Sequence, residues 1–313
     1  MIGPHILVLG AGSIGSRHAA NLHAAGAVVT VADPDPIRAE RTSLPTVAYD
    51  LSRIDGYDGI VVASPTAQHR DQTLAALATG ARVLVEKPLV LSAIDLDESL
   101  TGSAQLMVGY NLRFHRPVRR LVELVHSGAL GTPYLVRLWF GSWLPDWRPD
   151  VDYRTTYSAR LALGGGVLLD AIHELDLLVW LFGSSGYTVA GAVVDRIGPL
   201  EIDVEDTVAA VLRHSDGVVV EIALDYLSRR YRRGIEVLGT EATARFDWAR
   251  QILEVEDAGT VTAETDATSV GRSYELEAEH FLAFVAGRAG PSVDGATGAA
   301  SVRLADAIRS AAT

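Results

Sequence analysis

Asp170 and His173 lie three residues apart, directly after the glycines at residues 164–166. The apolar residues around this pair have the spacing of the buried face of one helix: Leu168, Ile172, Leu175, Val179 and Phe182. On such a helix the two polar side chains can reach the same space. A carboxylate beside an imidazole orients the ring and raises its basicity, as a general base needs. The spacing predicts either this acid–base pair or a polar helix face without chemistry.

A glycine-rich segment near the start of the chain indicates a phosphate site. The apolar residues 6–9 are followed by Gly10-Ala11-Gly12-Ser13-Ile14-Gly15 and then by a helical pattern to about residue 25. The first glycine permits a tight turn, the second lets the backbone approach a pyrophosphate, and the third lets helix and strand pack closely. The N-terminus of the helix supplies free N–H groups to the phosphates. We therefore expect dinucleotide binding.

An acidic residue follows the next apolar run, residues 28–32, at Asp33. A carboxylate at this distance from the glycines accepts hydrogen bonds from an adenosine ribose and repels a 2′-phosphate. The sequence therefore favours NAD over NADP, although Arg38 is close enough in the chain to keep NADP open. The alternative is that residues 33–36 form only a turn and a helix start.

Two further buried strands are expected at residues 60–63 and 82–85. The first ends in a loop with Ser64, Pro65, Thr66 and His69. Ligands bind at the carboxyl ends of such strands, so this loop is expected to border the nicotinamide. For His69 the alternative is a local hydrogen bond at a helix start.

The second of these strands runs into Glu86-Lys87-Pro88. A lysine at the end of a buried strand, followed by proline, is well placed to face a cofactor and a substrate. Its ammonium group can donate to a hydroxyl or carbonyl oxygen. The alternative is a solvated lysine at the strand tip, paired with Glu86.

A long loop over residues 142–157 is rich in aromatic and basic side chains. Loops of this length are uncommon unless they are functional or disordered, and the aromatic content argues against disorder. Aromatic faces stack on sugars and arginine forks bind carboxylate or phosphate. We expect a sugar-binding wall with room for an anionic group. The alternative is an interdomain or subunit interface, where the same residue types are enriched.

Three motifs in this order give the chain a resemblance to a known family. They are Glu86-Lys87-Pro88, Gly109-Tyr110-Asn111-Leu112-Arg113-Phe114 and Gly164-Gly165-Gly166-x-x-x-Asp170-x-x-His173. With the glycine loop, they resemble the glucose-fructose oxidoreductase / inositol dehydrogenase / MocA family over essentially the whole chain. The resemblance implies nicotinamide-dependent oxidation or reduction of a hydroxyl or keto group on a sugar, nucleotide sugar or cyclitol.

The fold implied by the resemblance has two domains. An α/β Rossmann domain with a parallel sheet is expected over residues 1–117. An α+β domain with a large, mostly antiparallel sheet is expected over residues 118–313, and its open face often mediates homodimers or homotetramers in the family. Helical spacing at residues 116–127, 274–287 and 299–308, and strand patterns at residues 134–140, 188–197, 207–213, 218–224 and 234–238, agree with this plan. The last two helices are expected to cover the sheet or dock back on the first domain.

The resemblance also implies roles for individual residues. His173 is the base or acid, Lys87 hydrogen-bonds the reacting oxygen, and Asp170 orients His173. In the commoner family spacing four steps separate the aspartate from the histidine, so Asp176 is an alternative partner.

The expected contacts fall into two sets. The cofactor is expected to contact the glycine loop and the following strand ends: Gly10, Gly12, Ser13, Ile14, Gly15, Asp33, Arg38, Ser64, Pro65, Thr66, His69, Glu86 and Lys87. The substrate is expected to contact the second motif and the long loop: Asn111, Arg113, Trp143, Trp147, Arg148, Arg154 and Tyr157.

Composition limits the other functions. The chain has 313 residues, a formal net charge of −12 and no cysteine. The charge argues against a nucleic-acid surface, and disulfides, thiolate zinc sites and cysteine nucleophiles are excluded. No metal site is expected, because Leu177 breaks an H-E-x-x-H pattern. Neither a signal peptide nor a bilayer span is expected, and the cysteine-free chain suits the cytoplasm.

Two alternative functions use the same residues. One is a redox-neutral epimerase or eliminase that retains NAD, and the other is a non-catalytic nucleotide-sensing protein on a Rossmann scaffold. The first would consume substrate without a net change in nicotinamide absorbance.

Overall fold

The computed structural model describes residues 3–265 and 270–312 and divides into two compact units. The first unit comprises the described residues of Met1–Phe114 and Ser269–Ala299, and the second comprises those of His115–Thr268 and Ala300–Thr313. The predicted second domain, residues 118–313, included the described part of Ser269–Ala299. In the structure this segment belongs to the first unit.

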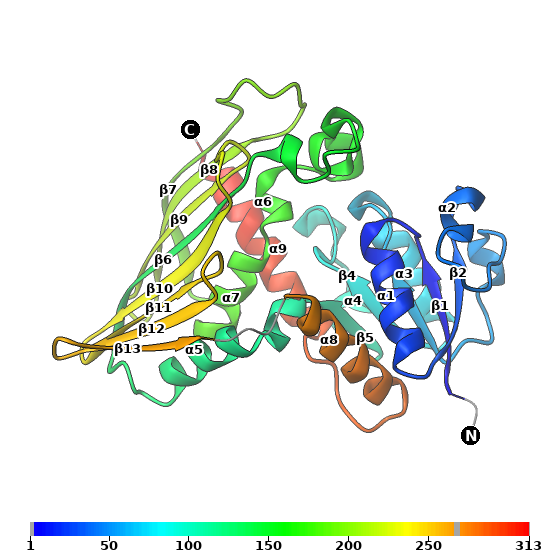
Figure 1. Cartoon of the computed structure of the whole chain (residues 1–313), viewed down its shortest axis with the longest axis horizontal. Helices are drawn as coiled ribbons and strands as arrows, with labels where there is room; N and C mark the ends of the chain where they lie inside the picture. Colours follow the sequence, from blue (N-terminus) through cyan, green and yellow to red (C-terminus); the bar gives the residue numbers. More distant parts are fainter. Residues whose placement is uncertain (1–2, 266–269, 313) are drawn as a thin grey trace. The chain divides into compact units, whose positions relative to one another are not determined.

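The first unit is built on a parallel five-stranded sheet, in the order β2-β1-β3-β4-β5 (Figure 1). The strands are β1 (His5–Leu9), β2 (Val28–Ala32), β3 (Gly59–Val62), β4 (Arg82–Glu86) and β5 (Leu106–Gly109). Its helices are α1 (Ser13–Ala24), α2 (Pro36–Glu40), α3 (His69–Ala78), α4 (Glu98–Thr101) and α8 (Val270–Val285). The strands are short, mostly buried and rich in apolar residues, which is typical of a parallel sheet covered on both faces. The predicted Rossmann fold is confirmed.

Helix α8 returns to this unit from far along the chain. Its apolar face packs into the core beneath the parallel sheet, where Phe281 and Phe284 join Ile6 and Val8 in one buried cluster. The helix also packs against α1. The helical spacing predicted at residues 274–287 is therefore confirmed, and the helix lies with the first unit.

The second unit contains an eight-stranded sheet, in the order β13-β12-β11-β10-β6-β9-β8-β7. Its strands are β6 (Pro133–Gly141), β7 (Tyr187–Asp195), β8 (Thr207–His214), β9 (Val219–Asp225), β10 (Arg232–Gly239), β11 (Ala242–Asp247), β12 (Ile252–Asp257) and β13 (Thr260–Thr265). Neighbours are antiparallel except β6 and β9, which run parallel. The predicted large, mostly antiparallel sheet is confirmed. Its helices are α5 (Arg116–His126), α6 (Val167–Asp170) and α7 (His173–Phe182), while α9 (Gly295–Ser310) begins in the first unit and ends in the second.

The glycine turn and the helix after it differ from the prediction in one respect. The apolar stripe is buried as expected, with Leu168, Ile172 and Leu175 at 0% exposure. However, the predicted single helix is two helices, because α6 ends at Asp170 and α7 begins at His173. The reason is the backbone at Ala171, which leaves the helical region with φ −94° and ψ 26°.

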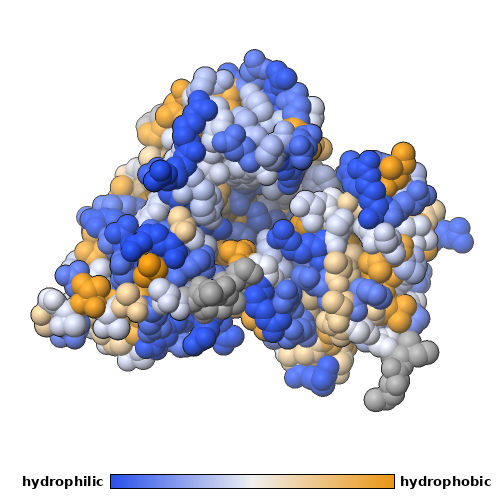
Figure 2. All heavy atoms as spheres, in the orientation of Figure 1, coloured by the Kyte–Doolittle hydropathy of each residue, from blue (hydrophilic) through white to orange (hydrophobic). Residues whose placement is uncertain are grey.

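Few large apolar side chains lie on the surface. Figure 2 shows hydrophobic residues as small separate groups among hydrophilic ones on the visible face. Scattered exposed apolar residues are normal for a folded protein. Within residues 3–265 and 270–312, the helices are all too short or too polar to cross a membrane.

One buried ion pair joins α7 to the sheet of the second unit. Arg233 on β10 donates from Nε to Glu174 Oε1 at 2.6 Å and from Nη2 to Oε2 at 3.1 Å. The Glu174 side chain is 1% exposed and that of Arg233 is 12% exposed. Two parallel hydrogen bonds compensate the loss of hydration that burial imposes on both charges.

We expect Arg233→Met to lower the free energy of unfolding by about 3–5 kcal/mol, because the Glu174 carboxylate would stay buried without its cation. The matched control is Arg137→Met on β6, which removes an exposed ion-pair network with Glu221 and Glu236. That change should cost no more than about 1 kcal/mol. Urea denaturation of both variants measures the difference, and equal costs would contradict the account.

Candidate functional site

The glycine loop lies at the carboxyl end of β1 and has no room for larger residues at two of its glycines. Gly10 has φ +98°, and a Cβ there would lie 2.7 Å from the Ala63 carbonyl oxygen. A Cβ on Gly15 would lie 1.9 Å from the Gly10 carbonyl oxygen. Without these Cβ atoms, the start of α1 can lie close against the ends of β1 and β3. These short distances are the physical reason for glycine at both positions.

Gly12 differs, because a Cβ built on it meets no atom within 4 Å. It is also the N-cap of α1, where no side chain caps the helix and no acidic residue lies in the first turn. Ser13 and Ile14 follow in that turn. The first N–H groups of the helix are thus available to an anion, and the space over Gly12 admits its approach. The residues present fit the pyrophosphate of a dinucleotide.

Asp33, at the end of β2, is tied to the same loop. Its Oδ2 accepts a hydrogen bond from the Ala11 N–H at 2.6 Å and its Oδ1 accepts one from the Asp35 N–H at 2.8 Å. A carboxylate has further lone pairs with which to accept ribose hydroxyls. Arg38 lies nearby on α2, half exposed, with its Nε 3.8 Å from Asp35 Oδ2.

The loop after β3 is fixed mainly by His69. Its Nδ1 lies 2.7 Å from the Pro88 carbonyl oxygen and its Nε2 lies 2.9 Å from that of Ser64. Burial lowers the pKa of His69, so the ring is neutral and donates one of these bonds at a time. His69 therefore joins the Ser64-Pro65-Thr66 loop to the turn after Lys87, and its predicted place beside the nicotinamide stays a prediction.

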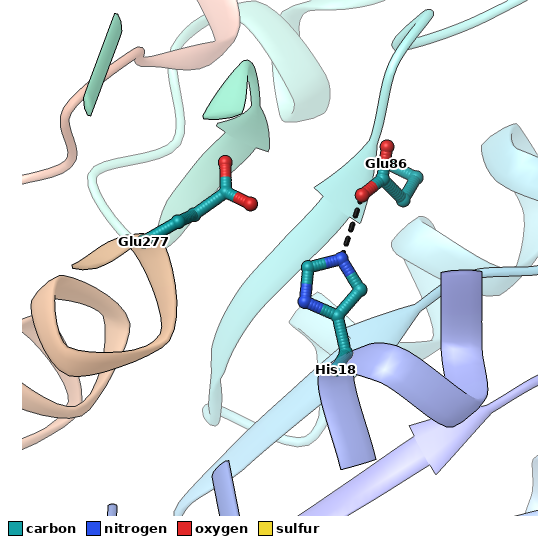
Figure 3. Close-up of side chains that lie close together, drawn as sticks. All are labelled: His18, Glu86 and Glu277. Carbon is teal, nitrogen blue, oxygen red and sulfur yellow. Dashed lines mark hydrogen bonds and ion pairs between the residues drawn. The ribbon is translucent and has the colours of Figure 1, made fainter. Parts of the chain in front are cut away.

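Lys87 follows β4 and is half-buried, and the peptide bond to Pro88 is cis. The side chain of Glu86 makes hydrogen bonds within the protein, and its contact with the cofactor stays a prediction. Glu86 Oε1 lies 2.6 Å from His18 Nε2, and Oε2 accepts from the Lys87 N–H at 3.1 Å. Figure 3 shows the His18–Glu86 contact and, beside it, Glu277 from α8.

The second motif lies at the end of the first unit. Asn111 is 2% exposed and donates from Nδ2 to Ser273 Oγ on α8 at 2.7 Å. Arg113 is half-buried in the same short 3-10 helix. Asn111 thus helps to hold α8 in the first unit, and its amide is engaged within the protein.

In the second unit, Asp170 lies between two phenols. Tyr226, just after β9, donates its hydroxyl to Asp170 Oδ2 at 2.5 Å, and Tyr157 also hydrogen-bonds Asp170. Burial and the Asp170 charge raise the pKa of both tyrosines well above its usual value. Both phenols therefore keep their protons and donate to the carboxylate, which restrains it.

His173 begins α7 and is 7% exposed, while Asp176, one turn along, is 1% exposed. Both side chains are thus nearly removed from solvent, as a proton-transfer group and its partner require. The choice between Asp170 and Asp176 as that partner stays a prediction.

The long loop contributes to this cluster through Trp147. Its ring packs edge-on against Tyr226, with centroids 5.3 Å apart, and against Phe140 at 5.9 Å. Arg148 lies over the Tyr157 ring, 5.8 Å from its centroid. The structure therefore brings Trp147, Arg148 and Tyr157 together with Asp170.

Two other loop residues have partners of their own. The Arg154 guanidinium donates to Asp152 and, at 2.7 Å, to Glu201 Oε2. Trp143 is covered by Arg229, whose guanidinium lies 3.5 Å from the ring centroid. A substrate would have to compete with these contacts.

Sequence reasoning missed Tyr226, Arg229, His18 and Glu277. Tyr226 had a usable signal, since it is a polar residue that directly follows a buried strand. His18 and Glu277 had none, because they lie on ordinary helical patterns and meet only through the return of α8.

Comparison with known proteins agrees with this architecture. Residues 5–108 match the profile described as "Oxidoreductase family, NAD-binding Rossmann fold", and residues 118–245 match "GFO/IDH/MocA C-terminal domain". The two matches cover most of both units.

Curated relatives span most of the chain. A 1,5-anhydro-D-fructose reductase from Ensifer adhaerens is 28% identical over 270 residues, which is 82% of this chain and 77% of that protein. A myo-inositol 2-dehydrogenase from Thermotoga maritima is 27% identical over 273 residues, or 79% and 76%.

A solved structure shares the whole fold. Levoglucosan dehydrogenase in complex with NADH and levoglucosan superposes with a TM-score of 0.86 at 20% identity, covering 99% of this chain and 97% of that one. With both domain profiles matched in order and the predicted motifs in place, the chain belongs to the GFO/IDH/MocA family of oxidoreductases.

Proposed function

We propose that this protein is an NAD-dependent oxidoreductase that exchanges a hydride with a secondary hydroxyl or keto group of a sugar, nucleotide sugar or cyclitol. The observation that carries the proposal is the open glycine loop tied to Asp33 in a chain that also has a nearly buried His173. The substrate class is supported by the relatives, which are named for a sugar derivative and a cyclitol.

The residues divide the chemistry as follows. When bound, nicotinamide accepts or supplies the hydride. His173 takes the hydroxyl proton during oxidation and returns it during reduction. Lys87 donates a hydrogen bond to the reacting oxygen and favours the charge that develops there. Asp170, restrained by its two phenols, supports His173, with Asp176 as the alternative.

The remaining contacts are proposed from their places in the chain. Gly12, Ser13 and Ile14 hold the pyrophosphate, and Asp33 accepts from the adenosine ribose. Trp147 and Tyr157 offer aromatic surface to the substrate, and Arg148 offers a cation for an anionic group.

We further propose that the chain forms a homo-oligomer through the open face of the eight-stranded sheet. Val193 on β7 and Val211 on β8 are 44% and 43% exposed, and the strand register places both beside Ala209 on one face. Exposed aliphatic residues grouped on a sheet face favour burial against a second copy.

We also propose that the protein works in the cytoplasm, where nicotinamide dinucleotides are dissolved. A cysteine-free chain is compatible with a reducing compartment. Cell fractionation that recovers the protein elsewhere would contradict this.

The first prediction of the proposed function concerns the cofactor. Fluorescence titration of nucleotide-stripped protein should show tighter binding of NADH than of NADPH, because Asp33 repels a 2′-phosphate. Asp33→Asn should reduce this preference by about tenfold or more, which corresponds to about 1.4 kcal/mol. Arg38→Ala, the control on exposed α2, should leave NADH binding unchanged. Tighter NADPH binding by the wild type would move the assignment to Arg38.

The second prediction concerns His173. His173→Ala should lower kcat by about 10²- to 10⁴-fold, the usual contribution of a general acid–base group, and leave the NADH dissociation constant unchanged. The control is His126→Ala, at an exposed histidine at the end of α5. Steady-state kinetics with a substrate found by screening sugars and cyclitols measures both. Near-normal kcat in the His173 variant would refute the assignment.

The third prediction concerns assembly. Val211→Lys should convert the oligomer to a smaller species, because a lysine on the sheet face would be desolvated in the interface. Ile37→Lys, at a 61% exposed residue of the first unit, is the control and should not change the mass. Light scattering coupled to gel filtration measures the mass, and a monomeric wild type would contradict the proposal.

A further inference from the structure

Three buried titratable side chains meet in the first unit. His18 comes from α1, Glu86 from the end of β4, and Glu277 from α8. Their exposed fractions are 0%, 7% and 0%. One ring nitrogen of His18 and one carboxylate oxygen of each glutamate all lie within 4.8 Å of one another. Figure 3 shows the Glu277 carboxylate directed toward the other two residues.

The hydrogen bonding of this cluster is incomplete within the protein. His18 Nε2 and Glu86 Oε1 are 2.6 Å apart, so the ring donates to the carboxylate. Within residues 3–265 and 270–312, neither oxygen of Glu277 has a hydrogen-bond partner, and the same holds for His18 Nδ1. Buried polar atoms without partners are rare and costly, so their gathering at one place calls for a specific arrangement of protons.

A protonated, neutral Glu277 would give these unpartnered atoms a hydrogen-bond donor. Burial, and then the nearby Glu86 charge, raise the pKa of Glu277 well above its usual value. A neutral carboxylic acid has one O–H donor, and the His18–Glu86 pair offers acceptors at Nδ1 and on the carboxylate. Where the direct distance is too long for a hydrogen bond, a buried water between the three side chains would meet three polar partners.

The geometry favours a shared proton over a metal ion. Zinc takes histidine and carboxylate ligands at about 2.0–2.2 Å from the ion, which sets two ligand atoms further apart than a hydrogen bond does. The direct 2.6 Å contact between His18 and Glu86 is that of a donor and its acceptor.

The cluster is connected to Lys87 through a single residue. Glu86 uses Oε1 for His18 and Oε2 for the Lys87 N–H, at 3.1 Å. The side chain that anchors in the cluster therefore also holds the backbone that carries the lysine. His69 holds the other side of the turn through the Pro88 carbonyl oxygen at 2.7 Å.

We propose that His18, Glu86 and Glu277 form one buried hydrogen-bond network, in which Glu277 is a neutral acid, and that this network fixes the backbone at Lys87. His18 and Glu277 are then positioning residues that act through Glu86. The functional part rests on the role proposed for Lys87, whereas the protonation of Glu277 does not.

The protonation is tested by infrared spectroscopy of the whole protein at neutral pH. The difference spectrum between the wild type and Glu277→Gln should contain the carbonyl band of a protonated carboxylic acid, shifted in D₂O. A difference spectrum with only carboxylate bands would overturn the network. The same samples analysed for bound metal should contain no stoichiometric ion that disappears with the substitution, and its presence would overturn the proposal in favour of a metal site.

The positioning role is tested by kinetics. Glu277→Ala and His18→Leu should lower kcat by up to about 100-fold, the effect of misplacing a reacting group by about 1 Å, with the NADH dissociation constant unchanged. Glu277→Gln keeps a neutral hydrogen-bonding side chain and should restore most of kcat. The control is Thr73→Val, which alters a fully buried hydroxyl of α3 outside the cluster. Wild-type kcat in folded Glu277→Ala would contradict the positioning role.

The variant Lys87→Met distinguishes a failure of the role proposed for Lys87 from a failure of the buried network. If this variant keeps full activity, the role proposed for Lys87 fails while the infrared band remains. If the variant is inactive but the band is absent from the wild type, the network alone fails. If Glu277→Ala does not fold, the Glu277→Gln spectrum still tests the protonation, and the kinetics of His18→Leu still test the positioning role.

Discussion

The hydrogen bond from the Ala11 N–H to the Asp33 carboxylate, at 2.6 Å, is the contact on which the cofactor loop depends. It fixes the glycine loop against the end of β2, while the 1.9 Å that a Cβ on Gly15 would leave to the Gly10 oxygen excludes any larger residue there. The loop, the start of α1 and the Asp33 carboxylate are thus linked in one arrangement. Pre-organisation of this kind lowers the entropy lost on binding. The Asp33 carboxylate stabilises the loop through this bond, and in the function proposed above it also selects between the two dinucleotides.

Charged side chains in or near the core are compensated in a different way at each proposed functional position. Glu174 is paired with Arg233 by two hydrogen bonds, Asp170 accepts from Tyr226 and Tyr157, and Glu86 is paired with His18. Each pairing restrains a side chain next to, or three residues from, a proposed reacting group. A buried charge must keep its partner, so a paired side chain has few other low-energy conformations. The pairing therefore also restrains the residue next to it in the chain.

Local patterns in the sequence were sufficient for the parallel sheet, the glycine loop and most antiparallel strands. Buried strands are short apolar runs, and the turn after Gly10 needs glycine wherever it occurs. The break between α6 and α7 could not be predicted, since neither Ala171 nor Ile172 is a helix breaker. Strand β13 is exposed along its whole length, so it lacks the alternation that marks a strand. The return of α8 is a tertiary event, and the partners that it brings, Glu277 for His18 and Ser273 for Asn111, are invisible to any local pattern.

The most direct test of the central claim is to follow a deuterium label. The protein is incubated with NAD⁺ and a sugar or cyclitol substrate carrying deuterium on the carbinol carbon, and the nucleotide is examined by mass spectrometry and NMR. Direct hydride transfer predicts one deuterium on C4 of the nicotinamide, in amounts equal to the keto product. Label that remains wholly in the converted sugar would indicate a redox-neutral cycle with retained cofactor. Label lost to water, with the nucleotide unlabelled, would contradict hydride transfer itself.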